Sequence, residues 1–128
     1  MQILLDTHAL LWFLTDNPRL PKKWRLRLTT AGTRVFYSSV SILEIAIKHS
    51  LKPDAMPCPP DEVESAAEAS GLSPMPFTSA HAKVVGSLPW LHRDPFDRML
   101  LAQARTDGLP LLTHDEDVLR YGDGAIGF

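Results

Sequence analysis

Cysteine is almost missing from this sequence, with Cys58 as the only one among 128 residues. One cysteine cannot form a disulfide within the chain, so nothing indicates the cross-linked framework of a small secreted protein. The same shortage argues against a zinc site, because structural zinc sites are usually built on several cysteines.

Long apolar runs are also missing. No stretch approaches the roughly 18 apolar residues of a membrane-spanning helix. The first residues, MQILLD, have neither the basic segment nor the apolar stretch of a signal peptide. We therefore expect a cytoplasmic protein that does not contact a membrane.

The chain has no excess of positive charge, since 13 lysines and arginines face 15 acids for a net charge of −2. It therefore has no general basic field to attract a nucleic acid. If the partner is RNA, the attraction must come from local basic patches or from a bound metal ion. Six candidates for phosphate contacts, each of which could equally be part of an ordinary solvated face, are Lys22, Lys23, Arg25, Arg27, Arg93 and Arg98.

Several familiar site motifs do not occur. There is no GxxxxGK phosphate loop and no GxGxxG dinucleotide motif, and the five histidines show no HExxH or HxH spacing. No GxSxG turn marks a nucleophilic serine. A phosphoryl-accepting DxD loop would need a second acid two residues after Asp6, where the sequence has His8.

What the sequence does have is the content of one globular domain, 1–128, with 45% hydrophobic and 22% charged residues. Apolar and β-branched runs predict strands, and residues repeating at helical spacing predict helices. The expected strands are 3–5, 34–38, 72–77, 109–113 and 124–128, and the expected helices are 8–14, 21–30, 41–49, 60–71, 79–88, 95–108 and 115–121. Prolines interrupt 72–77, which suits an edge strand. The alternation predicts an α/β fold with a parallel sheet of four to five strands between two layers of helices.

Four acids stand out: Asp6, Glu44, Asp97 and Asp115. Each has an ordinary structural explanation. Asp6 can cap the helix after the first strand, and Ser41 to Glu44 and Thr113 to Glu116 both fit capping boxes. Asp94 fits the N-cap of the helix that carries Asp97, and Glu44 can pair with Lys48 one turn later.

Their joint placement points further. Asp6 and Asp115 follow apolar strands directly, and ligands of parallel α/β sheets bind outside the carboxyl ends of the strands. Asp97 shares a helix face with Leu101 and Ala104, so it should face the sheet. No lysine or arginine adjoins Asp6 or Asp115 in the sequence. A hard divalent ion, Mg²⁺ or Mn²⁺, would relieve the repulsion between converging carboxylates.

Four segments, in order, resemble the motifs of PIN-domain nucleases, and specifically of the VapC toxin branch. They are LLDTHALLW at 4–12, SSVSILEI at 38–45, HRDPFDRMLLAQA at 92–104 and LLTHD at 111–115. Each motif alone is weak, but four in the family's order and spacing cover nearly the whole chain.

The resemblance implies a PIN-like three-layer fold and a metal-dependent endoribonuclease that hydrolyses RNA. Asp6, Glu44, Asp97 and Asp115 match the family's acidic quartet. Asp6, Asp97 and Asp115 are the expected metal ligands, and Glu44 is expected to orient the attacking water. Thr7, Asp94 and Thr113 are expected to support them, with Asp97 preferred to Asp94 because the LLAQA helix follows it at the family's offset.

The resemblance also implies partners: a homodimer and a small VapB-like antitoxin protein that neutralises the toxin. Trp12, Phe13 and Trp24 are candidates for exposed apolar contacts, although core packing explains each of them equally well. Two other interpretations stay open. One is a housekeeping RNA-processing nuclease without an antitoxin, and the other is a non-catalytic RNA-binding domain on the same fold.

Overall fold

A five-stranded parallel sheet forms the centre of the computed structural model, which describes all residues, 1–128. The strands lie in the order β3-β2-β1-β4-β5, so β1 is in the middle. The strands are β1 (Gln2–Leu5), β2 (Arg34–Ser38), β3 (Ser73–Met75), β4 (Leu111–Thr113) and β5 (Ala125–Gly127). The expected α/β class and parallel sheet are confirmed, and β3, with its proline, lies at an edge.

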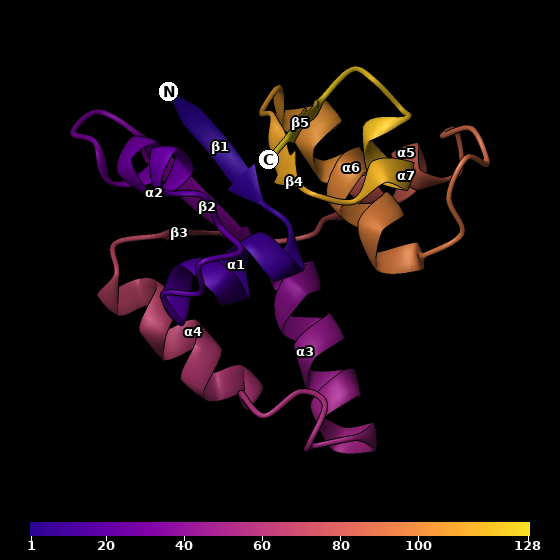
Figure 1. The fold of residues 1–128 in the computed structure, drawn as a ribbon. Coiled ribbons are helices and arrows are strands. Elements are labelled where there is room, and N and C mark those ends of the chain that lie inside the picture. Colours follow the sequence, from indigo (N-terminus) through magenta and orange to yellow (C-terminus); the bar gives the residue numbers. More distant parts are fainter.

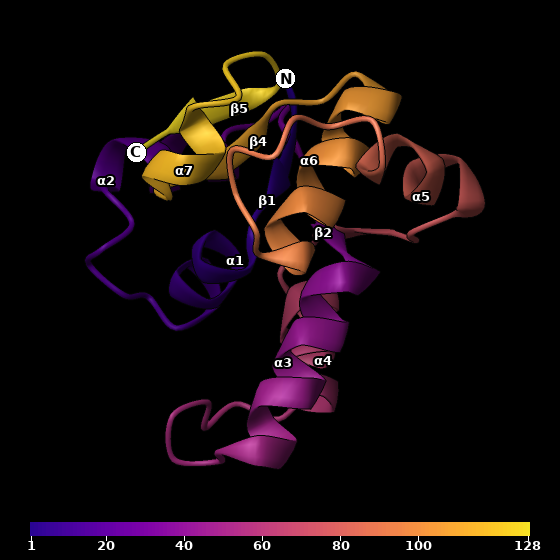
Figure 2. The same cartoon turned by 90° about the vertical axis from the view of Figure 1, so that its right-hand side faces the viewer.

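Helices cover both faces of the sheet (Figure 1). They are α1 (Thr7–Leu14), α2 (Lys22–Thr29), α3 (Ser39–Leu51), α4 (Pro60–Ala69), α5 (Ser79–Val85), α6 (Pro95–Asp107) and α7 (Glu116–Leu119). In Figure 1, α1, α2 and α4 lie on one side of the strands, and α5, α6 and α7 lie on the other. Figure 2 shows α3 extending away from the sheet, below the N-terminal end of α6.

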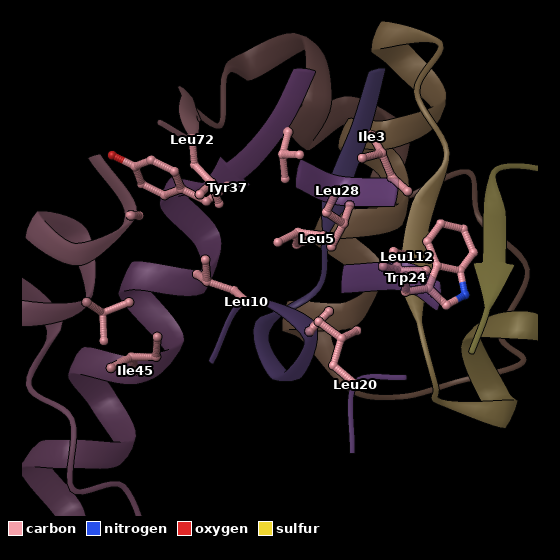
Figure 3. Close-up of a cluster of buried hydrophobic side chains, with 14 residues drawn as sticks. Ile3, Leu5, Leu10, Leu20, Trp24, Leu28, Tyr37, Ile45, Leu72 and Leu112 are labelled. Atoms are coloured by element: carbon pink, nitrogen blue, oxygen red, sulfur yellow. The ribbon is translucent and has the colours of Figure 1, made fainter. Parts of the chain in front are cut away.

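The central strand divides its side chains between two cores, because successive residues of a strand point to opposite faces. Ile3 and Leu5 belong to the cluster shown in Figure 3, together with residues of α1, α2, α3 and α4. Leu4 points the other way, into a second cluster built largely on α6. Both faces of β1 are therefore dry over residues 3–5, which explains the uninterrupted apolar sequence there.

The structure corrects one expected helix start and decides one alternative that the sequence left open. The helix after β2 begins at Ser39 rather than Ser41, because Ser38 is its N-cap and the Ser38 hydroxyl accepts a bond from the Val40 amide at 2.9 Å. The capping box that begins at Ser41 is therefore not formed. Trp24 is only 4% exposed and belongs to the core (Figure 3), so it does not offer a surface to a partner.

No helix of the protein is both long enough and apolar enough to cross a membrane.

The ends of β1, β2 and β4 meet at one edge of the sheet. The Asp6 amide donates to the Leu112 carbonyl at 3.1 Å, which aligns the end of β1 with the end of β4. Buried Gln103 of α6 accepts from the Ser38 hydroxyl and donates to the Met75 carbonyl, so it ties α6 to the ends of β2 and β3. This edge carries the candidate site.

Candidate active site

The four acids singled out in the sequence come from four different elements. Asp6 follows β1, Glu44 lies on α3, Asp97 lies in the first turn of α6, and Asp115 follows β4 as the N-cap of α7. Their charges act on one another, because Glu44 raises the pKa of Asp6, while Asp6 and Asp115 raise the pKa of Asp97. Asp6 and Asp115 follow the neighbouring strands β1 and β4, and Asp97 and Asp115 lie 2.8 and 3.9 Å from the same nitrogen of His92. Figure 2 shows the start of α6 above α3, the helix that carries Glu44.

Three aspartates of this edge are also helix caps. Asp6 Oδ1 accepts from the Ala9 amide at 2.7 Å, and Asp94 Oδ1 and Asp115 Oδ1 each accept two amides of the first turn that follows. These aspartates therefore do cap helices, but capping does not prevent them from binding a metal ion. These amide bonds occupy one oxygen of each carboxylate, and an ionised carboxylate offers about four acceptor positions.

Thr113 supports two of these acids. Its side chain is fully buried, and its hydrogen bond to Asp6 lowers the pKa of that carboxyl. The Thr113 hydroxyl also accepts from the Asp115 amide at 3.1 Å. Because Asp115 itself is the N-cap of α7, the expected capping box that begins at Thr113 is not formed.

Glu44 is held on both of its oxygens. The Thr7 hydroxyl donates to Oε1 at 2.7 Å, and Lys48 forms an ion pair with Oε2. Thr7 also lies 3.0 Å from the Ser41 hydroxyl, so three buried polar side chains lock one another in place. Because both oxygens of Glu44 already have partners, this carboxylate is better suited to orienting a bound molecule than to serving as a direct metal ligand.

His92 is the residue of the site that sequence reasoning missed. Its Nε2 lies 2.8 Å from Asp97 Oδ2 and 3.9 Å from Asp115 Oδ2, while Nδ1 lies 3.6 Å from Asp117 Oδ2. The only signal for it was its place at the start of HRDPFD, two residues before Asp94 and five before Asp97. Searching for histidines spaced from other histidines could not find a histidine that acts alone.

The pKa values of the site show a strongly negative, poorly hydrated environment. Burial raises the pKa of Asp6 to about 6, against the hydrogen bonds from Thr113 and from the Ala9 amide. Burial also raises the pKa of Asp97 to about 6, and the charges of the neighbouring acids add to the rise. Burial lowers the pKa of His92, but its bond to Asp97 and the surrounding acids outweigh that effect and raise it. Burial, more than the mutual repulsion of the acids, is the larger cause for both aspartates.

The donor set fits a hard divalent cation. Ligand atoms of His92, Asp94 and Asp97 all lie within 4.8 Å of one another. Carboxylate oxygens predominate, which suits Mg²⁺ or Mn²⁺, while a histidine nitrogen is a better ligand for softer ions. A 2+ ion at this edge would offset the cost of keeping the buried Asp6 and Asp97 ionised.

Two of the six expected phosphate contacts are structural instead. Arg98 is 2% exposed, donates to three backbone carbonyls and to the Tyr121 hydroxyl, and stacks on the Trp90 ring at 3.8 Å. Arg25 donates to the Trp12 and Phe13 carbonyls at the end of α1. The other four remain on the surface: Lys22, Lys23, Arg27 and Arg93.

Comparison with known sequences gives one match. The family model described as PIN domain matches residues 3–124, which is almost the entire chain. No curated protein sequence matches the chain.

Several solved structures with the same fold are of complexes named VapBC. A chain of VapBC2 from Rickettsia felis, bound to a DNA fragment from its promoter, has a TM-score of 0.72 at 16% identity, over 99% of this chain and 98% of that one. A chain of DNA-bound VapBC from Salmonella typhimurium has a TM-score of 0.67 at 21% identity, over 100% and 97%. A chain of VapBC-1 from nontypeable Haemophilus influenzae has a TM-score of 0.66 at 13% identity, over 100% and 97%. At these identities the likeness is one of fold.

Proposed function

Because this chain belongs to the PIN-domain family, we propose that it is a metal-dependent endoribonuclease of the VapC type, which hydrolyses phosphodiester bonds in RNA. One PIN unit would occupy the whole of 1–128. The observation that carries the proposal is the joint placement of Asp6, Asp97 and Asp115 at one sheet edge, where two of the three have a pKa raised to about 6. Acids held this way are costly to the fold, and such cost is typical of functional sites.

Asp6, Asp97 and Asp115 would hold the ion through carboxylate oxygens that the helix amides leave free. When bound, Mg²⁺ or Mn²⁺ supplies positive charge that acidifies a water molecule and offsets the charge building up on the phosphate. Glu44 orients the attacking water, and the Thr7 hydroxyl fixes the Glu44 carboxylate at 2.7 Å so that it points the same way in every turnover.

RNA must approach an acidic edge on a protein whose net charge is −2. Of the six cations expected from the sequence, the exposed Lys22, Lys23 and Arg27 of α2 and the exposed Arg93 remain candidates for phosphate contacts. Such contacts position the backbone of the RNA without reading its sequence. They predict binding that weakens steeply as salt is added.

We place the protein in the cytoplasm as one half of a toxin–antitoxin pair: a homodimer neutralised by a small VapB-like antitoxin. The support is that chains of the same fold occur in complexes named VapBC. Trp12 and Phe13 are half-buried rather than exposed, so they offer less apolar surface than the sequence suggested. Leu43, Ile47 and Leu51, spaced four residues apart on α3, expose more.

A partner of this kind leaves a genetic trace. A toxin gene should lie next to a small gene for a protein with a DNA-binding part and a flexible tail. Co-purification of the two products, and a dimeric mass for the toxin by light scattering, are the expected results. A monomer at high concentration, with no binding by the neighbouring product, would favour a nuclease without an antitoxin.

The experiment that tests the activity is cleavage of single-stranded RNA by the purified protein. We expect cleavage with Mg²⁺ or Mn²⁺, none in EDTA, and recovery when the ion is restored. Asp6→Asn and Asp97→Asn should each lose most of the activity, Asp94→Asn should lose less, and Asp54→Asn, in an exposed loop, should lose none. Full activity in EDTA would overturn the proposal, and loss in Asp94→Asn alone would move the ligand role to that residue.

A further inference from the structure

A cavity of about 520 Å³ lies beside the acidic edge, lined by His8, Trp12, Arg19, His114 and Phe128. We call it the aromatic pocket. Its volume lies within the roughly 300–1,000 Å³ of small-ligand sites. The lining is unusual in kind, because all five side chains end in a planar group and only Trp12 and Phe128 are apolar.

The rings of the aromatic pocket form two stacked pairs that meet at Trp12. His8 stacks on Trp12 with ring centroids 5.4 Å apart and planes at 29°, and His114 stacks on Phe128 at 5.6 Å and 27°. Trp12 and His114 join the pairs at 4.7 Å. The Arg19 guanidinium lies 5.7 Å from the Trp12 ring centroid. Four aromatic rings therefore lie together in the pocket, and the Arg19 guanidinium lies beside them.

Two residues that line the aromatic pocket are near neighbours of the catalytic acids in the sequence. His8 stands two residues after Asp6, and His114 stands directly before Asp115. Figure 2 shows the C-terminal end, which carries Phe128, next to α7 on this side of the molecule.

We propose that the aromatic pocket binds an unpaired nucleobase of the RNA, one that flanks the bond being cut. Bases of single-stranded RNA stack on aromatic and guanidinium planes, and every base has such a face. Arg19 is placed to meet a neighbouring phosphate, and the two histidines can hydrogen-bond the edge of a base. An aliphatic peptide side chain would gain less here, since three of the five lining groups are polar. This inference rests on the proposed nuclease function, because it assigns the RNA a position relative to the acids.

A contact experiment tests the pocket without relying on catalysis. A single-stranded RNA dodecamer carrying 5-iodouridine at each position in turn is irradiated with the protein in EDTA, and the cross-linked peptide is sequenced. We expect cross-links within 8–19 or 114–128. Cross-links confined to exposed Trp90, or equal cross-linking by a fully paired duplex, would overturn the inference.

A second experiment measures the coupling between base and pocket. In an RNA that the protein cuts at a mapped bond, the base on either side of that bond is removed in turn. At one position, removal should lower kcat/KM about tenfold to a hundredfold, the range expected for one stacked base. The ratio of interest is kcat/KM for the intact RNA divided by kcat/KM for the RNA that lacks the base. In His114→Ala and Trp12→Leu this ratio should fall below about threefold, because the altered pocket no longer distinguishes the two RNAs. Because His114 is exposed, His114→Ala should fold normally. The same loss in both variants therefore cannot be explained by misfolding of Trp12→Leu.

Controls separate this inference from the nuclease proposal. Trp90→Leu removes an exposed tryptophan elsewhere and Lys83→Ala removes an exposed positive charge elsewhere, so both should keep the full ratio. Cross-links in the pocket without any RNA cleavage would support the pocket and refute the nuclease. RNA cleavage with an unchanged ratio in the pocket variants would support the nuclease and refute the pocket. Weaker binding of an antitoxin by those variants, with that ratio unchanged, would reassign the pocket to a protein partner.

Discussion

Replacing Asp97 by asparagine should make the metal-free protein more stable at neutral pH, although it removes a charged group from a helix N-terminus. In the folded protein the pKa of Asp97 rises from 3.8 to about 6, chiefly because the side chain is buried, with only 19% of it exposed. A shift of about two units corresponds to about 3 kcal/mol against the ionised form. Losing a negative charge in the first turn of a helix costs about 0.3–1 kcal/mol. The net gain should be about 2 kcal/mol, or on the order of 5–10 °C in Tm.

The pH dependence identifies the cause. The folded pKa exceeds the unfolded one, so the penalty is fully present above about 6 and is absent below 3.8. Melting in EDTA at pH 7.5 and pH 4.0 should therefore give a large difference between Asp97→Asn and wild type at the higher pH and almost none at the lower. Asp54→Asn should match wild type at both. A variant that melts below wild type at pH 7.5, or a difference that does not change with pH, would show that the carboxylate of Asp97 stabilises the fold.

Three further predictions concern the surroundings of the acids. Arg98→Met should lower the free energy of unfolding in urea by at least about 3 kcal/mol, since it leaves buried carbonyls without donors; a loss below about 1 kcal/mol, or full rescue by Arg98→Lys, would contradict its role. Thr7→Val should cost about 1–3 kcal/mol and most of kcat, because it frees one oxygen of buried Glu44, and Thr7→Ser should restore both; equal behaviour of the two variants would show that the hydroxyl is not needed. Mg²⁺ at 100 times its Kd should stabilise the wild type by about 2.7 kcal/mol through mass action, and the gain should shrink in Asp6→Asn; an equal gain in that variant would place the ion elsewhere.

Much of the fold could be read from the sequence because its signals are local. The apolar run before Asp6 predicts a buried strand, and the proline before Phe96 marks the start of α6, where Asp94 caps the helix as expected. The prolines around 74 and 76 predicted an edge strand, and β3 is one. In each case a residue type restricts the backbone directly, so no knowledge of distant contacts is needed.

The rest depended on contacts between residues far apart in the chain. Nothing local tells that Thr7 bonds Glu44, 37 residues later, or that Arg98 is turned inward to bind carbonyls while Arg93, five residues earlier, stays at the surface. His92 was missed because its partner Asp97, although only five residues away, is reached through the turn before α6, and its second partner, Asp115, is set by the meeting of α6 with the end of β4. A side chain's charge shows in the sequence, whereas the direction in which it points does not.

The central claim is that these acids, with a divalent ion, activate water to hydrolyse RNA. The most direct test is cleavage in water enriched in oxygen-18, followed by mass analysis of the new RNA ends. The account predicts one labelled oxygen in the new terminal phosphate, no 2′,3′-cyclic phosphate, and continued cleavage when the nucleotide at the cut lacks its 2′-hydroxyl. Unlabelled cyclic phosphate ends, formed by attack of that hydroxyl, would contradict it.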